Sequence, residues 1–284
     1  MRTGQFFRGV LCAAMLSAMP GAGVHAQVPA VTGHERLVTL DHGSNFRDIG
    51  GYPARDGKHV RWGLIYRSAA TPLLTPADMV RLKALGLANL VDLRSDEERV
   101  VAPTRLDGIP YSAVGYSMAA MMNAAGGFDM KSLYHSFPTF LAPQLRIIFR
   151  DLERKREPIA YNCSAGQDRT GFATAMILSA LGVPRDVIYQ DYLLSTGYRH
   201  PEYELPPIDA ALAATSPVAG MLAKAQQDPR YAKPNPLFGA DKVPYLTYAF
   251  DEIDAKWGSP ENYLKQEVGL TAQDIDQLRA LYLE

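Results

Sequence analysis

Short apolar runs alternate with longer segments of helical periodicity along most of the chain. Four short, largely apolar runs predict strands, at residues 62–69, 87–95, 109–116 and 158–162. Apolar residues at helical spacing, with Thr and Ser caps, Pro in first turns and Gly at ends, predict helices. These lie at residues 75–86, 132–155, 170–182, 184–198, 243–258, 259–269 and 271–283.

The alternation of strands and helices predicts an α/β fold, a central sheet with helices on its faces and extra helices in the tail. Residues 201–242 are rich in Pro and Ala and are interpreted as an insertion of short helices and loops. Residues 118–129, rich in Met, Ala and Gly, fit either a packed helix or a mobile cover over a pocket.

The N-terminus has the pattern of a secretory signal. Two arginines precede an apolar stretch at 10–19, and small residues follow up to Ala26. We predict a signal peptide at 1–26, a linker at 27–39 and one catalytic domain at 40–284, in a periplasmic or secreted protein. A membrane anchor is the alternative, but the apolar stretch is shorter than the roughly 20 residues that a span requires.

Composition narrows the class of partner. The chain has 284 residues, 47% of them hydrophobic and 21% charged, which is enough to bury a core. Its formal charge is -1, so we expect neither a nucleic-acid partner nor, after signal removal, an integral membrane span. Of its two cysteines, Cys12 lies in the predicted signal and Cys163 does not. A lone thiol in an oxidising compartment is either a buried filler or a nucleophile.

The segment "CSAGQDRTG" stands between a predicted strand and a predicted helix. Backbone N–H groups of such a loop and of the helix N-terminus form a cradle for a tetrahedral oxyanion, and the same field favours a thiolate. Cys163 is placed to be the nucleophile, and the planar fork of Arg169 to hold two phosphate oxygens. The predicted phosphate-binding residues are Ser164, Ala165, Gly166, Gln167, Asp168, Arg169 and Thr170.

These parts suit hydrolysis of a phosphomonoester through a cysteinyl-phosphate. Backbone donors and Arg169 supply the charge stabilisation, so the chemistry requires no metal or other cofactor. The histidines show no metal-ligand spacing. The leaving oxygen needs an acid, for which the candidates are Asp168 and Asp92. A structural pairing of Asp92 with Arg94 or Arg99 remains open.

The loop, together with "NFRDIGGY" (45–52), "YRSA" (66–69) and "VDLRSDEE" (91–98), resembles the cysteine-dependent protein tyrosine phosphatase superfamily. The match is strongest with the bacterial group typified by mycobacterial tyrosine phosphatase B and its lipid-phosphatase relatives. The resemblance implies a mostly parallel sheet, Cys163 as nucleophile, Arg169 as phosphate clamp, and Asp168 in acid catalysis or positioning. In "NFRDIGGY", Arg47 and Asp48 are interpreted as a buried ion pair.

The chain departs from this pattern at two positions. Asn162 stands where His is usual before the cysteine, and Gln167 stands where members active on phosphoinositides often have Lys. The predicted substrate is a phosphorylated protein, phospholipid or small phosphomonoester. We expect a protein tyrosine phosphatase, with dual specificity and a phosphoinositide phosphatase as open alternatives. The other alternative functions are a non-catalytic phosphate-binding protein and a rhodanese-like sulfurtransferase.

Overall fold

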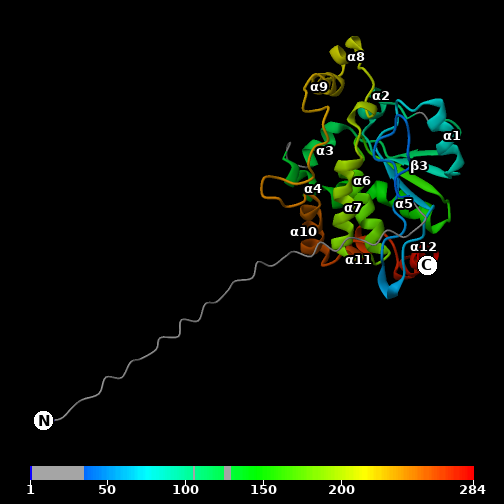
Figure 1. The fold of residues 1–284 in the computed structure, drawn as a ribbon, viewed down its shortest axis with the longest axis vertical. Coiled ribbons are helices and arrows are strands. Elements are labelled where there is room, and N and C mark those ends of the chain that lie inside the picture. The colour runs from blue at the N-terminus through cyan, green and yellow to red at the C-terminus, as the bar shows by residue number, and fades with distance from the viewer. Residues whose placement is uncertain (2–34, 105, 125–128) are drawn as a thin grey trace. The chain divides into compact units, whose positions relative to one another are not determined.

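A five-stranded sheet organises the protein in a computed structural model, which describes residues 1, 35–104, 106–124 and 129–284 (Figure 1). The strands are β1 (Arg47–Asp48), β2 (Ile65–Ser68), β3 (Asn89–Asp92), β4 (Tyr111–Ala113) and β5 (Ile159–Asn162). They lie in the order β1-β2-β5-β3-β4; β1 is antiparallel to β2 and the other neighbours are parallel. The predicted α/β class and mostly parallel sheet are confirmed.

The register of the three central strands determines where a site forms. Ser68 of β2 and Asp92 of β3 both lie opposite Asn162 of β5. The parallel strands therefore end at one level, and the loops that follow them meet at one edge of the sheet. Sites of α/β proteins lie at this carboxyl edge, and Cys163 is the first residue beyond the central strand.

Helices fill the connections and the tail. Before β5 they are α1 (Pro76–Ala84), α2 (Asp96–Val101), α3 (Met118–Ala124), α4 (Met130–Phe140) and α5 (Ala142–Glu153). After β5 they are α6 (Asp168–Ala180), α7 (Arg185–Tyr198), α8 (Ala210–Thr215), α9 (Pro217–Gln226), α10 (Leu246–Trp257), α11 (Pro260–Tyr263) and α12 (Ala272–Tyr282). Short helical turns are η1 (Arg55–Gly57), η2 (Pro201–Tyr203) and η3 (Leu264–Val268).

The helix predicted at 132–155 is in fact two helices. α4 ends at Phe140 and α5 begins at Ala142, with Pro143 in its first turn. Leu141 between them has φ -94° and ψ 1°, and Pro143 has no N–H to donate to a carbonyl four residues back, which favours a break here. Proline alone does not fix the break, because Pro138 lies inside α4. Other predicted ends are confirmed: Thr75 caps α1 by accepting from the Asp78 N–H, and Thr271 caps α12 in the same way.

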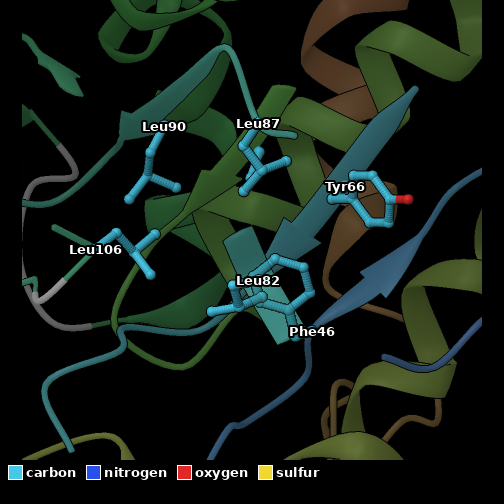
Figure 2. Packing of buried hydrophobic residues seen from close by; sticks show 7 residues of the cluster. Phe46, Tyr66, Leu82, Leu87, Leu90 and Leu106 are labelled. Atoms are coloured by element: carbon cyan, nitrogen blue, oxygen red, sulfur yellow. The ribbon is translucent and has the colours of Figure 1, made fainter. Parts of the chain in front are cut away.

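Helices cover both faces of the sheet. α5 and α6 pack on one face, and α10 and α11 pack against α6 (Figure 1). On the other face, Leu82 of α1 lies in a buried cluster with Tyr66 and Leu90 of the strands (Figure 2). Burying such side chains stabilises the fold by about 1.5–3 kcal/mol each. The sheet is thereby held between two apolar layers, one on each face.

The N-terminal predictions lie largely outside the described residues. Of the predicted signal and linker, the structure describes Met1 and residues 35–39. Among the helices within the described ranges, none combines the length and apolarity that crossing a membrane requires. The 201–242 segment contains η2, α8 and α9 joined by loops, as the composition predicted.

Candidate active site

The loop from Cys163 to Gln167 joins β5 to α6 at the sheet edge. Cys163 is 2% exposed, so its thiol lies at the base of any approach from solvent. Gly166 has φ +65°, and a Cβ there would lie 2.6 Å from the backbone nitrogen of Ala69. Both the left-handed conformation and the close approach of backbone restrict this position to glycine.

Three successive loop carbonyls are held from outside the loop. The Ala70 N–H donates to the Ser164 oxygen at 3.0 Å, and Asn45 Nδ2 donates to the Ala165 and Gly166 oxygens at 3.2 and 2.8 Å. In a trans peptide the N–H points opposite to the carbonyl. The next three amides, of Ala165, Gly166 and Gln167, therefore point away from these anchors and into the loop. None of the three has a hydrogen-bond acceptor among the described residues.

A buried charge network stands behind these anchors. Arg47 Nε lies 3.1 Å from Asp191 Oδ1, and Arg67 Nη1 lies 2.5 Å from Asp191 Oδ2. Arg67 Nη2 also donates to the Gly166 oxygen at 2.7 Å. Burial by itself raises the pKa of Asp191, but the two guanidinium groups outweigh it and hold that pKa well below its usual range.

This network corrects the pairing predicted from "NFRDIGGY". Arg47 pairs with Asp191 of α7, which is 144 residues away in the sequence. Asp48 accepts the backbone N–H groups of Gly50 and Gly63 at 2.7 and 2.6 Å. Successive residues of a strand point to opposite faces, so Arg47 and Asp48 serve different contacts. Both are buried, as predicted.

Arg169 reaches back from α6 to Glu98 of α2. Its Nη1 and Nη2 donate to the two Glu98 oxygens at 2.7 and 2.6 Å, and Nη1 also donates to the Tyr116 hydroxyl at 2.7 Å. A guanidinium has five N–H donors. These contacts use three, and the Nε–H and the second Nη2–H remain along one edge, with the spacing that suits two phosphate oxygens.

Glu98 is a site residue that the sequence reasoning did not single out. Burial opposes its ionisation, but Arg169 outweighs burial and lowers the pKa of Glu98 to about 2. Glu98 also accepts the hydroxyl of Ser164 at 2.6 Å and the backbone N–H of Ser95 at 2.9 Å. The Ser95-x-x-Glu98 capping pattern was visible in "VDLRSDEE", but its meeting with Arg169 depends on the fold.

The two candidate acids lie in different surroundings. Asp168, the first residue of α6, is half-buried, and its Oδ1 accepts the Tyr134 hydroxyl at 2.7 Å. Asp92 is fully buried, and its Oδ2 lies 2.6 Å from Arg94 Nη2 and 2.9 Å from the Tyr111 hydroxyl. Asp92 thus has the structural pairing with Arg94 that the sequence left open. Asp168 is the carboxylate within the loop-helix junction.

Asn162 and Gln167, the two residues that depart from the family pattern, both form side-chain hydrogen bonds. Asn162 Nδ2 donates to the Cys163 carbonyl at 3.2 Å. Gln167 Oε1 accepts from Arg199 at 2.8 Å, and its Nε2 donates to the Asn235 carbonyl at 3.2 Å. Arg199 in turn pairs with Glu204 at 2.8 Å. A cation therefore lies beside the Gln167 position, with its charge matched by a carboxylate.

Short helices border the site on one side. α9 packs against α2, the helix that carries Glu98. A cavity of about 260 Å³ lies in the same region, lined by Ala225, Asp228, Arg230, Tyr231 and Asn235. The segment 118–129, predicted as either a packed helix or a mobile cover, forms α3 over its first residues, whereas 125–128 lie outside the described residues. In the described ranges, no three His, Cys, Asp or Glu side chains are grouped to hold a metal ion.

Comparisons with known proteins show which family the chain belongs to. Residues 38–284 match a family model described as the tyrosine phosphatase family. A Cupriavidus necator protein named as a tyrosine-protein phosphatase is 32% identical over 279 residues, which cover 91% of this chain and 94% of that protein. The triple specificity protein phosphatase PtpB of Mycobacterium tuberculosis is 27% identical, covering 84% of this chain and 96% of that protein.

More distant likenesses add little. A tyrosine-protein phosphatase of Nostoc commune is 26% identical over 228 residues, covering 75% of this chain and 72% of that protein. The crystal structure of P. aeruginosa TpbA aligns with 60% of this chain and 91% of its own, at 14% identity and a TM-score of 0.31. A structural likeness of that size carries no argument about the site.

Proposed function

Because the chain belongs to the tyrosine phosphatase family, we propose that it hydrolyses phosphotyrosine in proteins through a phosphocysteine formed on Cys163. The observation that carries the proposal is that the buried Cys163 begins a loop whose next amides point inward, and that its sulfur is close enough to Arg169 to interact with it electrostatically. Amide donors and a guanidinium are the groups that stabilise phosphoryl oxygens.

In the first step, the Cys163 thiolate attacks phosphorus, and the S–P bond forms as the bond from phosphorus to the tyrosyl oxygen breaks. The electron pair stays on that oxygen, which takes a proton from the Asp168 carboxyl group. The amides of the loop and Arg169 bind the three equatorial oxygens throughout. Asp168 suits this task better than Asp92, whose oxygens are occupied by Arg94 and Tyr111.

In the second step, water attacks phosphorus and gives its proton to the Asp168 carboxylate. The S–P bond breaks with its electron pair on sulfur, so inorganic phosphate leaves and the Cys163 thiolate is restored. Asp168 thus alternates between acid and base, and no group outside the chain is consumed except water.

Burial and charge support phosphotyrosine as the substrate. Cys163 is 2% exposed, and a phosphate on a long aromatic side chain reaches such a thiol more readily than one on serine. Gln167 brings no charge, and the Arg199 beside it is neutralised by Glu204. A headgroup with several phosphates therefore gains no additional unpaired cation here.

The test is phosphate release from four substrates in EDTA and reductant: a phosphotyrosine peptide, a phosphoserine peptide, a phosphothreonine peptide and a phosphoinositide. Turnover that is highest on phosphotyrosine and absent in Cys163→Ser supports the proposal. Comparable rates on the serine and threonine peptides would establish dual specificity instead. A highest rate on the phosphoinositide, or full activity in Cys163→Ser, would overturn it.

We also propose that the enzyme acts in the periplasm or outside the cell, on the strength of the signal-like pattern at 1–26. Mass spectrometry of the protein from fractionated cells tests this. A periplasmic or secreted species that begins near residue 27 is the expected result. A species that retains its first residues in the cytoplasm would contradict it.

A further inference from the structure

Two buried tyrosines connect α4 and α7 to the carboxylate of Asp168 at the start of α6. Tyr134 of α4 donates to Asp168 Oδ1 at 2.7 Å, and its hydroxyl oxygen lies 2.6 Å from that of Tyr192 of α7. Tyr134 and Tyr192 are 0% and 1% exposed. Within the described part of the chain, Tyr134 is the one side chain that donates to this carboxylate.

The direction of the hydrogen bonds from Tyr192 through Tyr134 to Asp168 follows from the single proton that each tyrosine hydroxyl carries. Burial raises the pKa of Tyr134 well above its ordinary value, and burial does the same for Tyr192, so both hydroxyls keep their protons. A phenol has one proton to donate. Because Tyr134 gives its proton to Asp168 Oδ1, Tyr192 must donate to Tyr134. The arrangement is an ordered chain of two donors that ends at the half-buried carboxylate.

Side-chain packing holds these two hydrogen-bonded tyrosines rigidly. The Tyr134 ring lies 4.8 Å from that of Phe137 and 5.9 Å from that of Tyr245, between centroids. A Cβ at Gly171 would lie 2.8 Å from the Tyr192 ring. The glycine that follows Thr170 therefore leaves room for Tyr192 against α6. A hydroxyl on a ring packed in this way positions its partner with little loss of further entropy.

We propose that Tyr134, supported by Tyr192, is the positioning residue for the general acid of this enzyme. Tyr134 holds Oδ1 of Asp168 and turns Oδ2 toward the leaving oxygen, where the proton is delivered. This inference rests on the proposed function, because it assigns Tyr134 a role only through Asp168. Tyr134 does not touch the reacting atoms.

Leaving-group dependence separates positioning from simple structural support. Phenyl phosphate expels a poor leaving group that needs the acid, whereas 4-nitrophenyl phosphate expels a good one that needs it much less. We expect Tyr134→Phe to lower kcat about ten-fold on phenyl phosphate and less than about two-fold on 4-nitrophenyl phosphate. Tyr192→Phe should show the same selectivity with a smaller effect.

Tyr161→Phe is the matched control. Tyr161 is equally buried, and its hydroxyl lies 2.8 Å from that of Thr174, away from Asp168. This variant should treat both substrates alike. In an Asp168→Asn background, Tyr134→Phe should have no further effect on phenyl phosphate, since the residue that it positions is gone.

Equal loss on both substrates in Tyr134→Phe would overturn the proposal, as would an undiminished effect in the Asp168→Asn background. Far-ultraviolet circular dichroism and melting of each variant show that the compared proteins are folded. The proposed function is judged separately: inactive Cys163→Ser and a leaving-group-dependent Asp168→Asn support it whatever Tyr134→Phe does. Full activity in Cys163→Ser would remove both proposals.

Discussion

The carboxylate of Glu98 holds the Arg169 guanidinium by two hydrogen bonds, of 2.7 and 2.6 Å, across the wall of the site. The pair uses one end of the guanidinium and leaves the edge formed by Nε and Nη2 without an acceptor among the described residues. It also links α2, with its capped first turn, to the start of α6. An arginine held in this way presents its remaining donors in one orientation before substrate binds.

The Glu98 pair predicts a stability difference that depends on pH. The pKa of Glu98 is lowered from 4.5 to about 2 in the folded protein. Its stabilising contribution is therefore complete above about pH 5 and is lost as the pH falls through about 2. We expect Glu98→Gln to lower the unfolding free energy on the order of 3 kcal/mol at neutral pH. Urea unfolding of both proteins measures the gap, which should at least halve by about pH 3. A gap that is independent of pH would contradict this role.

Replacement by asparagine should lower activity at Asp168 and lower stability at Asp92. Asp168→Asn removes the proposed proton donor, which is half-buried, so we expect kcat on phenyl phosphate to fall about 10²- to 10³-fold with little change in Tm. Asp92→Asn leaves Arg94 buried without its counter-charge, so it should cost about 3 kcal/mol of stability and leave the kcat of the folded fraction nearly unchanged. Kinetics and urea unfolding of both variants decide the assignment. The reverse pattern would make Asp92 the acid.

Two glycines should respond oppositely to alanine. Gly166 has φ +65° and its Cβ would lie 2.6 Å from backbone, so Gly166→Ala should lose at least about 2 kcal/mol and bind vanadate more weakly. Gly197 lies inside α7 with no heavy atom within 4 Å of its Cβ position. Gly197→Ala should therefore stabilise the protein by about 0.5–1 kcal/mol. Stabilisation by both substitutions would contradict the tight approach of the loop to β2.

We expect the Asp191 carboxylate, which pairs with both Arg47 and Arg67, to be essential for the hydrogen bonds that hold the loop carbonyls. Asp191→Asn leaves Arg47 and Arg67 close together without a counter-charge, and we expect a loss of about 3–5 kcal/mol in unfolding free energy. Phosphate should also bind less tightly, because Arg67 holds the Gly166 carbonyl. Ser195→Ala, which removes a neutral acceptor of both arginines, is the milder control at about 1 kcal/mol. An Asp191→Asn protein as stable as the control would show that the network is dispensable.

Most of the fold could be predicted from local sequence patterns. Most strand and helix positions followed from periodicity, and the starts of α1 and α12 from Thr caps that bond within their own first turn. β1 and α2, which are two and six residues long, were not predicted. The loop could be interpreted from sequence because Cys163 and Arg169 lie in one short segment between a strand and a helix. The break between α4 and α5 was missed because apolar spacing continued across Pro143.

The sequence by itself determined the order of most elements and the residues of the loop on which the proposed chemistry rests, since both depend on residues close together in the chain. The tertiary structure alone decided which distant side chains complete the site: Glu98 for Arg169, Asp191 for Arg47 and Arg67, and Tyr134 for Asp168. These partners are separated by 34 to 144 residues in the sequence, and local propensity carries no information about such contacts. They form because parallel strands bring the ends of β2, β3 and β5 to one edge, where buried charges must find partners.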